Sequence, residues 1–424
     1  MVDRPSDTTY NPMEDVRVVS RAVLQSLSHS MGLLTGRGLA REKHSQAKVG
    51  FQCFSLHLAT FFQSFLVRLR DEPDIETMIQ VLPHPHLDSR DLRELVRYLV
   101  DFLGFPPGSV RLFRQSVWES FDVVIYTDVF ARFSLGSRRN VLLNHGIGTS
   151  RRFTRRGFYR RYAYDFDEVF CASSLDQQSL LARQPAGNNT RILRSGSVIF
   201  DRLASPPVDR THYLTSLGLD PSQRTILFAP HFTRLRSPTY DTVRRTRLTL
   251  DLLATLHANV IVKLHDMSYY KHANGGYDWD ETMTRWQREG LRVDRDRDDV
   301  PALLYSDVIV TDVSSRGLIF VALGKSCILY LDGIVDGPGT EPTPLEPESH
   351  ALLRDVSSTA TSLEELRRLV ARALAQPRTV DRSAMLDRAG IRPAGSPTEG
   401  ILAHLRRSCS LPPPSDPRVS EDYG

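Results

Sequence analysis

The chain has 424 residues, of which 41% are hydrophobic and 25% are charged, and its net charge at pH 7 is only +4. At about 150 residues per domain, this length predicts two or three domains with cores large enough to fold without disulfides or a structural metal. The net charge is too small to indicate nucleic-acid binding by itself, and no known RNA- or DNA-binding motif is present.

The cysteines and the apolar runs indicate in which compartment of the cell the protein is found. The four cysteines lie far apart without a CxxC pair, which disfavours a disulfide scaffold and a cysteine-rich zinc site. No apolar run reaches the roughly 18 residues that a transmembrane helix needs. The polar, acidic N-terminus is unlike a secretory signal. We therefore expect a cytoplasmic protein.

Arginine supplies nearly all of the positive charge, because only five of the 54 basic residues are lysines. A GC-rich genome would explain this bias without any function. Guanidinium groups also suit phosphate and oxyanion recognition, because their rigid fork matches those anions. Local clustering has to distinguish the two explanations.

Along the chain, strand-length apolar runs alternate with amphipathic helical patterns. Residues 1–46 are expected to be an N-terminal extension. The first alternating series predicts strands at 47–54, 74–83, 120–128, 138–146, 167–173 and 190–198. A proline-rich break at 204–209 separates it from a second series, with strands at 225–230, 258–266, 291–296, 307–312 and 326–332. Such alternation is typical of parallel sheets covered on both faces.

We therefore predict an α/β protein with two doubly wound, Rossmann-like domains that face each other across a cleft, at residues 47–205 and 206–408. The tail, residues 409–424, is rich in proline and polar residues and is expected to be disordered. Ligands bind beyond the carboxyl ends of the strands in such sheets, so the candidate site residues are sought there.

Two histidines follow strands, one in each half. His145 lies in the turn NHGIG, where Gly146 lets the backbone come close to a ligand. His265 ends the strand of the second half that reads ANVIVKL. Imidazole is the usual general base near neutral pH, and histidines from both domains can meet across a cleft. A hydrogen-bonded structural histidine would explain either one alone.

An arginine cluster follows the first of these turns, within residues 151–161. Arg152, Arg155 and Arg156 fall on one face if this segment is helical. A solvated surface would account for them. A functional interpretation is contact with a polyphosphate, an anionic polymer or an acidic membrane surface.

The most informative turn is Thr311-Asp312-Val-Ser314-Ser315, between a strand and a helix. Helix N-termini receive phosphate readily, because their N–H groups lack partners and the helix dipole is positive there. Capping by Ser314 alone would explain one serine, but not the whole set. A P-loop, HExxH, GxSxG and GxGxxG are all missing from the sequence, and no carboxylate cluster indicates a metal site.

Together these segments resemble the CDP-glycerol glycerophosphotransferase family, the teichoic-acid and capsule polymerases and primases. The resemblance rests on NHGIG, on Gly196 to Asp201, on the strand end Ala229-Pro230-His231-Phe232, on Leu264-His265-Asp266, on the TDxSS turn, and on Lys325 to Asp332. It covers residues 140–332 in order and spacing. Departures include Asn144 in place of Trp, His231 in place of Thr and Asp266 in place of Pro.

The resemblance implies a GT-B fold and a transferase that needs no cofactor and no metal. Such an enzyme moves a glycerol-phosphate or related alditol-phosphate unit from a CDP-activated donor to a hydroxyl of a lipid-linked or polymeric anionic acceptor, and releases CMP. His145 would be the general base and His265 would support the donor phosphates, with Gly146, Pro230, Thr311, Asp312, Ser314 and Ser315 binding substrate. The arginine cluster would face the acceptor or the inner surface of the cell membrane, with no nucleic acid involved.

Two other hypotheses remain open. The first is a GT-B glycosyltransferase, or a UDP-N-acetylglucosamine 2-epimerase. The phosphate turn of such epimerases is usually glycine-rich and followed by Glu, whereas Arg316 and Gly317 follow the serines here. The second is a basic protein without enzymatic activity that binds anionic polymers.

Overall fold

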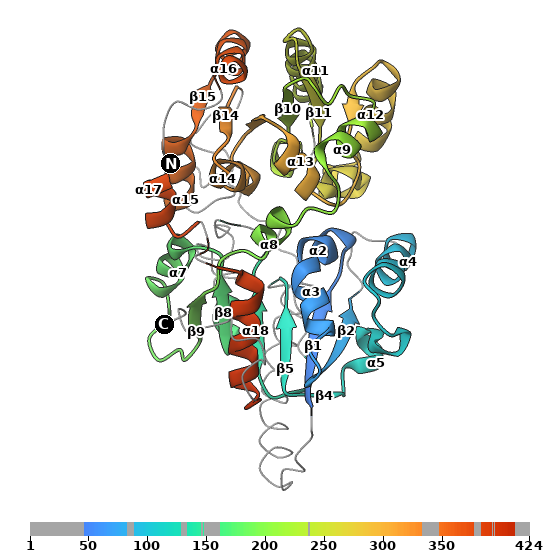
Figure 1. Ribbon diagram of the computed structural model, residues 1–424, viewed down its shortest axis with the longest axis vertical. Helices are drawn as coiled ribbons and strands as arrows, with labels where there is room; N and C mark the ends of the chain where they lie inside the picture. Colours follow the sequence, from blue (N-terminus) through green and yellow to red (C-terminus); the bar gives the residue numbers. More distant parts are fainter. Residues whose placement is uncertain are drawn as a thin grey trace, which may run out of the picture.

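The computed structural model describes residues 46–82, 89–128, 134–145, 147, 162–235, 238–332, 347–376, 383–391, 393 and 395–411. The expected extension (except residue 46), the arginine cluster and the tail beyond residue 411 lie outside the described residues. Within them, two parallel sheets form two domains that lie end to end (Figure 1). The α/β class and the two doubly wound halves predicted from the sequence are confirmed.

The first domain contains a seven-stranded parallel sheet in the order β3-β2-β1-β5-β7-β8-β9. Its strands are β1 (Ala47–Cys53), β2 (Ile75–Val81), β3 (Val110–Leu112), β5 (Val123–Tyr126), β7 (Asn140–Leu143), β8 (Glu168–Cys171) and β9 (Arg191–Arg194); β4 (Ser120–Phe121) pairs separately with β6 (Gly136–Ser137). Its helices are α2 (Leu56–Phe61), α3 (Gln63–Arg70), α4 (Ser89–Arg97), α5 (Phe113–Ser116), α7 (Ser174–Leu181) and α8 (Ile199–Ala204), with short turns η1 (Tyr98–Phe102), η2 (Pro107–Ser109) and η3 (Tyr162–Asp165).

The second domain contains a six-stranded parallel sheet in the order β12-β11-β10-β13-β14-β15. Its strands are β10 (Thr225–Phe228), β11 (Asn259–Val262), β12 (Arg292–Val293), β13 (Val308–Thr311), β14 (Ser326–Tyr330) and β15 (Ser358–Ala360). Its helices are α9 (Arg210–Ser216), α10 (Phe232–Leu235), α11 (Tyr240–Ala254), α12 (Trp279–Arg288), α13 (Val300–Tyr305), α14 (Ser315–Ala322), α15 (Pro347–Val356), α16 (Leu363–Ala375) and α17 (Ser383–Arg388), with turns η4 (Asp266–Tyr269) and η5 (Lys271–Asn274).

Two of the strands that sequence patterns miss, β3 and β15, lie at the edges of the two large sheets. β3 and β15 have three residues each, which is too few for an apolar period to show. β15 directly precedes α16, whose start is set by a capping box. The Ser362 hydroxyl accepts from the backbone N–H of Glu365 at 3.2 Å, and the Glu365 carboxylate accepts from the N–H of Thr361 at 2.8 Å. The start of this helix is thus set by contacts between residues at most four positions apart.

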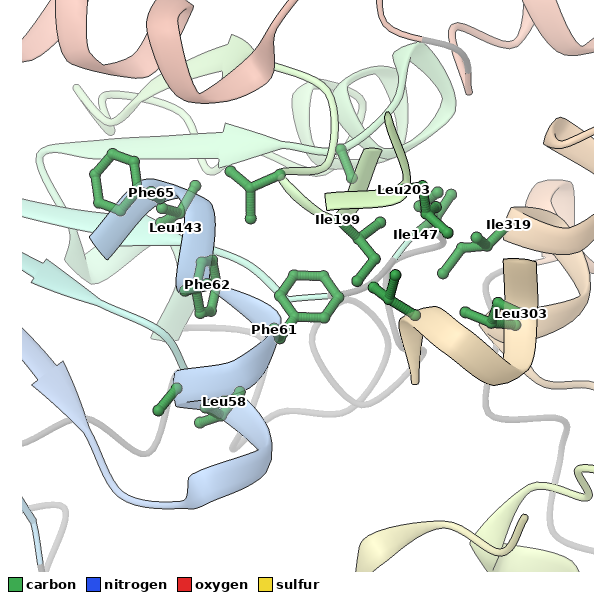
Figure 2. Close-up of a cluster of buried hydrophobic side chains, with 14 of the residues drawn as sticks. Leu58, Phe61, Phe62, Phe65, Leu143, Ile147, Ile199, Leu203, Leu303 and Ile319 are labelled. Carbon is green, nitrogen blue, oxygen red and sulfur yellow. The ribbon is translucent and has the colours of Figure 1, made fainter. Parts of the chain in front are cut away.

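A single hydrophobic cluster continues from one domain into the other (Figure 2). Leu58 and Phe61 on α2 and Leu203 on α8 belong to it, together with Leu303 on α13 and Ile319 on α14 of the second domain. All five side chains are at least nine-tenths buried. Burying a side chain of this size contributes about 1.5–3 kcal/mol, so the cluster favours one arrangement of the two domains.

The last helix, α18 (Pro397–Ser408), returns to the first domain, where it packs against α3 and α8 (Figure 1). The start of α18 contacts the segment from Gly196 to Asp201. The carboxylate of Asp201 accepts from the backbone N–H of Thr398 at 2.9 Å, and Gly196, with a φ of +77°, leaves room for Pro397. Sequence patterns assign residues up to 408 to the second domain, because local patterns carry no record of where a terminal helix docks.

Ion pairs hold α18 against the first domain. Arg406 is almost fully buried and pairs with Glu72 and with Asp74, the latter at 2.6 Å. Arg68 on α3 bridges Glu72 at 3.1 Å and Glu399 on α18 at 2.6 Å. Among the helices of the described part of the chain, none is long and apolar enough to cross a bilayer.

We expect Arg406→Ala to lower the free energy of unfolding by about 3 kcal/mol, because it leaves the buried Glu72 with Arg68 as its remaining cation. Arg407→Ala is the matched control, since the next residue on the same helix is exposed, and it should change stability by less than about 0.5 kcal/mol. Urea denaturation followed by circular dichroism measures both. Equal, small effects would mean that the buried pair does not hold α18.

Candidate functional site

The candidate site lies where the carboxyl ends of the two sheets meet. In the first sheet the chain reverses its winding between β1 and β5, and in the second between β10 and β13. Crevices form at such switch points, because the loops on the two sides diverge to opposite faces of the sheet. The residues that follow these strands are therefore the ones to search for chemistry.

Four histidines follow strands of the two sheets at this end. His57 comes after β1, His145 after β7, His231 after β10 and His265 after β11. The ring of His57, from the first domain, lies 5.9 Å from that of His265, and His231 lies 6.0 Å from His265, centroid to centroid. All four residues keep part of their surface exposed. The structure thus brings imidazoles from both domains to one place.

The surroundings of His145 fix which ring nitrogen carries the proton in the neutral form. Its Nδ1 lies 3.0 Å from the carbonyl oxygen of Thr127, which follows β5. A carbonyl only accepts, so Nδ1 is the protonated nitrogen and Nε2 carries the lone pair. Phe61 packs edge to face against the ring at 6.4 Å. An imidazole held in this way can act as a general base through Nε2.

His265 has the opposite arrangement. Its Nδ1 accepts a hydrogen bond from the backbone N–H of Met267 at 3.1 Å, where it caps η4. The proton of the neutral ring therefore lies on Nε2, which becomes a donor. Burial, reinforced by the positive charge of Arg316, lowers the pKa of His265 well below its ordinary value. This ring is suited to donate to a phosphate oxygen as a neutral group.

The TDxSS turn is built largely by bonds to the protein itself. The hydroxyl of Thr311 donates to the carbonyl of Ala229 at 2.6 Å, and Asp312 accepts from the backbone N–H of His231 at 2.8 Å. Ser314 caps α14, accepting from the N–H of Arg316 at 3.3 Å. These bonds join the ends of β10 and β13, so that the buried Pro230 and the N-terminus of α14 lie at the same switch point.

Arg316 is paired rather than open to a ligand. Its guanidinium donates to both carboxylate oxygens of Asp299, at 2.8 and 2.9 Å. Burial would raise the pKa of Asp299, but Arg316 and Lys263 outweigh it and hold this pKa below its ordinary value. Asp299 is thus a charged, paired carboxylate and is not poised for proton transfer.

The motif around β14 also serves the fold. Lys325 donates from Nζ to carbonyls at the end of α13, including those of Leu303 at 3.0 Å and Ser306 at 2.7 Å. The hydroxyl of Tyr330 donates to Asp332 at 3.0 Å. These residues fix the strand and helices around α14.

The structure places Pro230, Thr311, Asp312, Ser314 and Ser315 at the switch point of the second sheet, where His231 links them to His265. His145 lies on the first-domain side, beside Phe61. Gly146, Arg152, Arg155 and Arg156 lie outside the described residues. In the part of the chain that the structure describes, no group of three His, Cys, Asp or Glu side chains could hold a metal ion.

Sequence reasoning missed two of the four imidazoles. His57 lies in the FSLH segment after β1, which lacks glycines and so carries no familiar motif. His231 stands where the resembling family has Thr. The useful signal was positional, since both residues follow strands at the switch points of their sheets.

No protein-family model matches this sequence, and no curated protein matches it. Solved structures do. A variant of the wall teichoic acid polymerase TagF matches with a TM-score of 0.57 at 12% identity, over 95% of this chain and 99% of that one. A putative UDP-N-acetylglucosamine 2-epimerase from Listeria monocytogenes matches with a TM-score of 0.55 at 15% identity, over 88% and 99%. The UDP-GlcNAc 2-epimerase of Methanocaldococcus jannaschii, in complex with UDP-GlcNAc and UDP, gives 0.56 at 12% identity, over 85% and 99%.

The chain has the GT-B fold. At these identities the likeness shows the fold alone, and it is shared by a polymerase and by epimerases. The choice between chemistries has to come from the residues of the site.

The lowered pKa of His57 predicts a pH dependence of stability. Burial lowers the pKa of His57 to about 4, whereas the imidazole of an unfolded chain titrates near 6.5, so between these values the unfolded state binds more protons. Stability should therefore fall as the pH drops from about 6.5 towards 4, and His57→Gln should reduce that slope by up to about 1.4 kcal/mol per pH unit. The exposed His212 gives the control, His212→Gln. Urea denaturation at a series of pH values measures the slopes, and an unchanged slope in His57→Gln would contradict the assignment.

Proposed function

We propose that this protein transfers an alditol-phosphate unit, such as glycerol phosphate, from a CDP-activated donor to a hydroxyl of a surface-polymer acceptor and releases CMP. One observation carries the proposal. Two imidazoles from opposite domains lie at the meeting sheet ends with complementary tautomers, since His145 presents a lone pair at Nε2 and His265 presents an N–H at Nε2. Phosphoryl transfer to a hydroxyl needs both an acceptor of the hydroxyl proton and a donor to the phosphate.

In the proposed reaction, Nε2 of His145 takes the proton of the acceptor hydroxyl as its oxygen attacks the β-phosphorus of the donor. A new P–O bond forms to the acceptor, the P–O bond to CMP breaks, and CMP leaves with the electron pair. His265 donates from Nε2 to the donor phosphates, near the positive end of the α14 dipole at Ser314 and Ser315. Positioning and charge stabilisation supply most of the rate in such transfers.

Supporting roles for other residues follow from the turn that they build. Thr311 and Asp312 hold the end of β13 against β10, so that Pro230 and the start of α14 lie at one switch point, which we assign to the donor. We propose these residues as the frame of the donor site, with Ser315 as a direct contact because its side chain stays partly exposed.

The acceptor side of the proposal rests on sequence. The arginines at 152, 155 and 156 are proposed to face an anionic acceptor or the inner surface of the cell membrane, where lipid-linked polymers are extended. Guanidinium groups bind phosphate with paired hydrogen bonds, which suits a phosphate-rich chain. Peripheral membrane contact and the cytoplasmic location are part of this proposal.

CMP release from CDP-glycerol and CDP-ribitol, with a lipid-linked acceptor, tests the function. His145→Asn and His265→Asn are the sharpest variants, because the Asn amide can replace the Nδ1 bond of each ring but not Nε2. Each should lower the rate of CMP release about 10²–10⁴-fold, while the exposed His212→Asn should leave it unchanged.

The outcome decides between the chemistries that share this fold. Turnover of UDP-N-acetylglucosamine, without CMP release from either CDP-alditol, would replace the transferase with an epimerase. Full activity in both histidine variants would remove these residues from the mechanism.

A further inference from the structure

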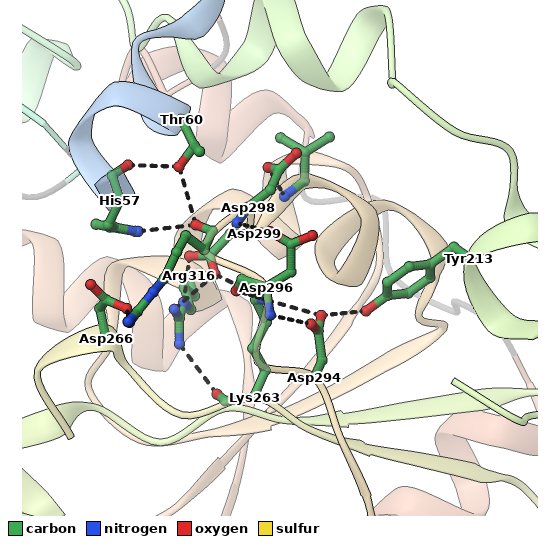
Figure 3. Close-up of polar contacts among 12 residues, drawn as sticks. His57, Thr60, Tyr213, Lys263, Asp266, Asp294, Asp296, Asp298, Asp299 and Arg316 are labelled. Atoms are coloured by element: carbon green, nitrogen blue, oxygen red, sulfur yellow. Dashed lines mark hydrogen bonds and ion pairs between the residues drawn. The ribbon is translucent and has the colours of Figure 1, made fainter. Parts of the chain in front are cut away.

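A run of six charged residues, DRDRDD at 294–299, connects β12 to α13. We call it the charged loop. Its members are held by specific partners within the described structure (Figure 3). Asp294 pairs with Lys263 at 2.9 Å, Arg295 with Asp280, Arg297 with Asp266, Asp298 with Arg202 and Asp299 with Arg316, while Asp296 accepts from the N–H of Asp298 at 3.0 Å.

The charged loop contacts the first domain through its backbone and through Asp298. The carbonyl oxygen of Arg297 lies 3.4 Å from Nδ1 of His57 and accepts from the hydroxyl of Thr60 at 3.1 Å, both on α2. Arg202 on α8 donates to both oxygens of Asp298, at 2.8 and 2.5 Å, and to the carbonyl of Thr60 at 2.6 Å. The backbone at Arg297 is therefore anchored to the opposite domain.

The side chain of Arg297 points back to the donor side of the site. Its guanidinium pairs with Asp266, the residue that follows His265. It also lies over the ring of Tyr270, at 6.0 Å, and the hydroxyl of Tyr270 donates to Asp91 on α4 of the first domain at 3.4 Å. One residue thus joins the first domain to the turn that presents His265.

We propose that Arg297 is a positioning residue, which holds His265 in its working orientation through Asp266 only when the two domains are together. The catalytic role of His265 rests on the proposed function, whereas the physical coupling does not. The bond from the N–H of Met267 to Nδ1 of His265 orients the ring, and that N–H belongs to the turn that begins at Asp266. A fixed Asp266 therefore fixes the ring.

The test compares Arg297→Ala with Arg295→Ala. Arg295 is the matched control, because it lies in the same loop and also pairs with an aspartate and stacks on a tyrosine. Its aspartate, Asp280, lies on α12, and its tyrosine, Tyr269, lies at the far end of the turn rather than beside His265. Hydrogen exchange read by mass spectrometry should show backbone amides at 266–270 exchanging about tenfold faster in Arg297→Ala than in the wild type or in Arg295→Ala. This measurement requires no activity.

Kinetics with the CDP-alditol donor give the second readout. Arg297→Ala should lower kcat by up to about 10²-fold, because a small misplacement of a catalytic group has an effect of this order, with a smaller change in the KM for the donor. Arg297→Lys should recover part of kcat. Asp266→Asn combined with Arg297→Ala should cost no more than the larger single effect, because both remove one interaction.

Each outcome bears on one of the two proposals. Equal exchange at 266–270 in Arg297→Ala and Arg295→Ala overturns the positioning role, whatever the activity. If Arg297→Ala does not fold, Asp266→Asn is compared with Asp280→Asn by the same measurement. Faster exchange in Arg297→Ala, together with a wild type that does not turn over either CDP-alditol, would support the coupling and contradict the proposed transferase activity.

Discussion

The parallel pairing of every strand in the two large sheets is the constraint on which the rest of the described structure depends. Each strand must return to the same edge through a crossover, so all carboxyl ends of a sheet collect at one side. In this chain those sides meet at the domain boundary, because the loops that follow β1 and β11 bring His57 and His265 to 5.9 Å, ring to ring. Residues distant in sequence thus form one site without any local motif joining them.

Burial then decides what these imidazoles can do. Desolvation is the largest cause that lowers the pKa values of His57 and His265, and it disfavours the charged ring. A neutral imidazole acts through the direction of its N–H, which the protein sets with one bond to Nδ1. Bonding Nδ1 of His145 to a carbonyl, and Nδ1 of His265 to an N–H, gives the same side chain two different chemical characters.

The sequence predicted features that depend on residues close together in the chain, and it missed features that depend on contacts between distant residues. Apolar runs predicted the long strands, because such signals act within a few residues. The position of His145 and His265 after predicted strands identified them as candidate site residues. The docking of α18 on the first domain depends on Arg406 reaching Glu72 and Asp74, more than 300 positions away. The partners of the charged loop are also non-local, so DRDRDD alone would suggest a solvated surface.

The charged loop contributes little to the free energy of folding, but it makes the relative position of the two domains more specific. Desolvating buried ion pairs such as Arg202–Asp298 and Arg316–Asp299 costs about as much as their attraction returns, and well-packed apolar residues would stabilise the fold as well. Apolar contacts such as those of Leu58 and Leu303, however, tolerate small slides of one domain over the other. Paired hydrogen bonds from guanidinium to carboxylate do not, because their energy depends on direction as well as distance. The hydrophobic cluster therefore holds the domains together, while the charged loop sets the position of one domain relative to the other.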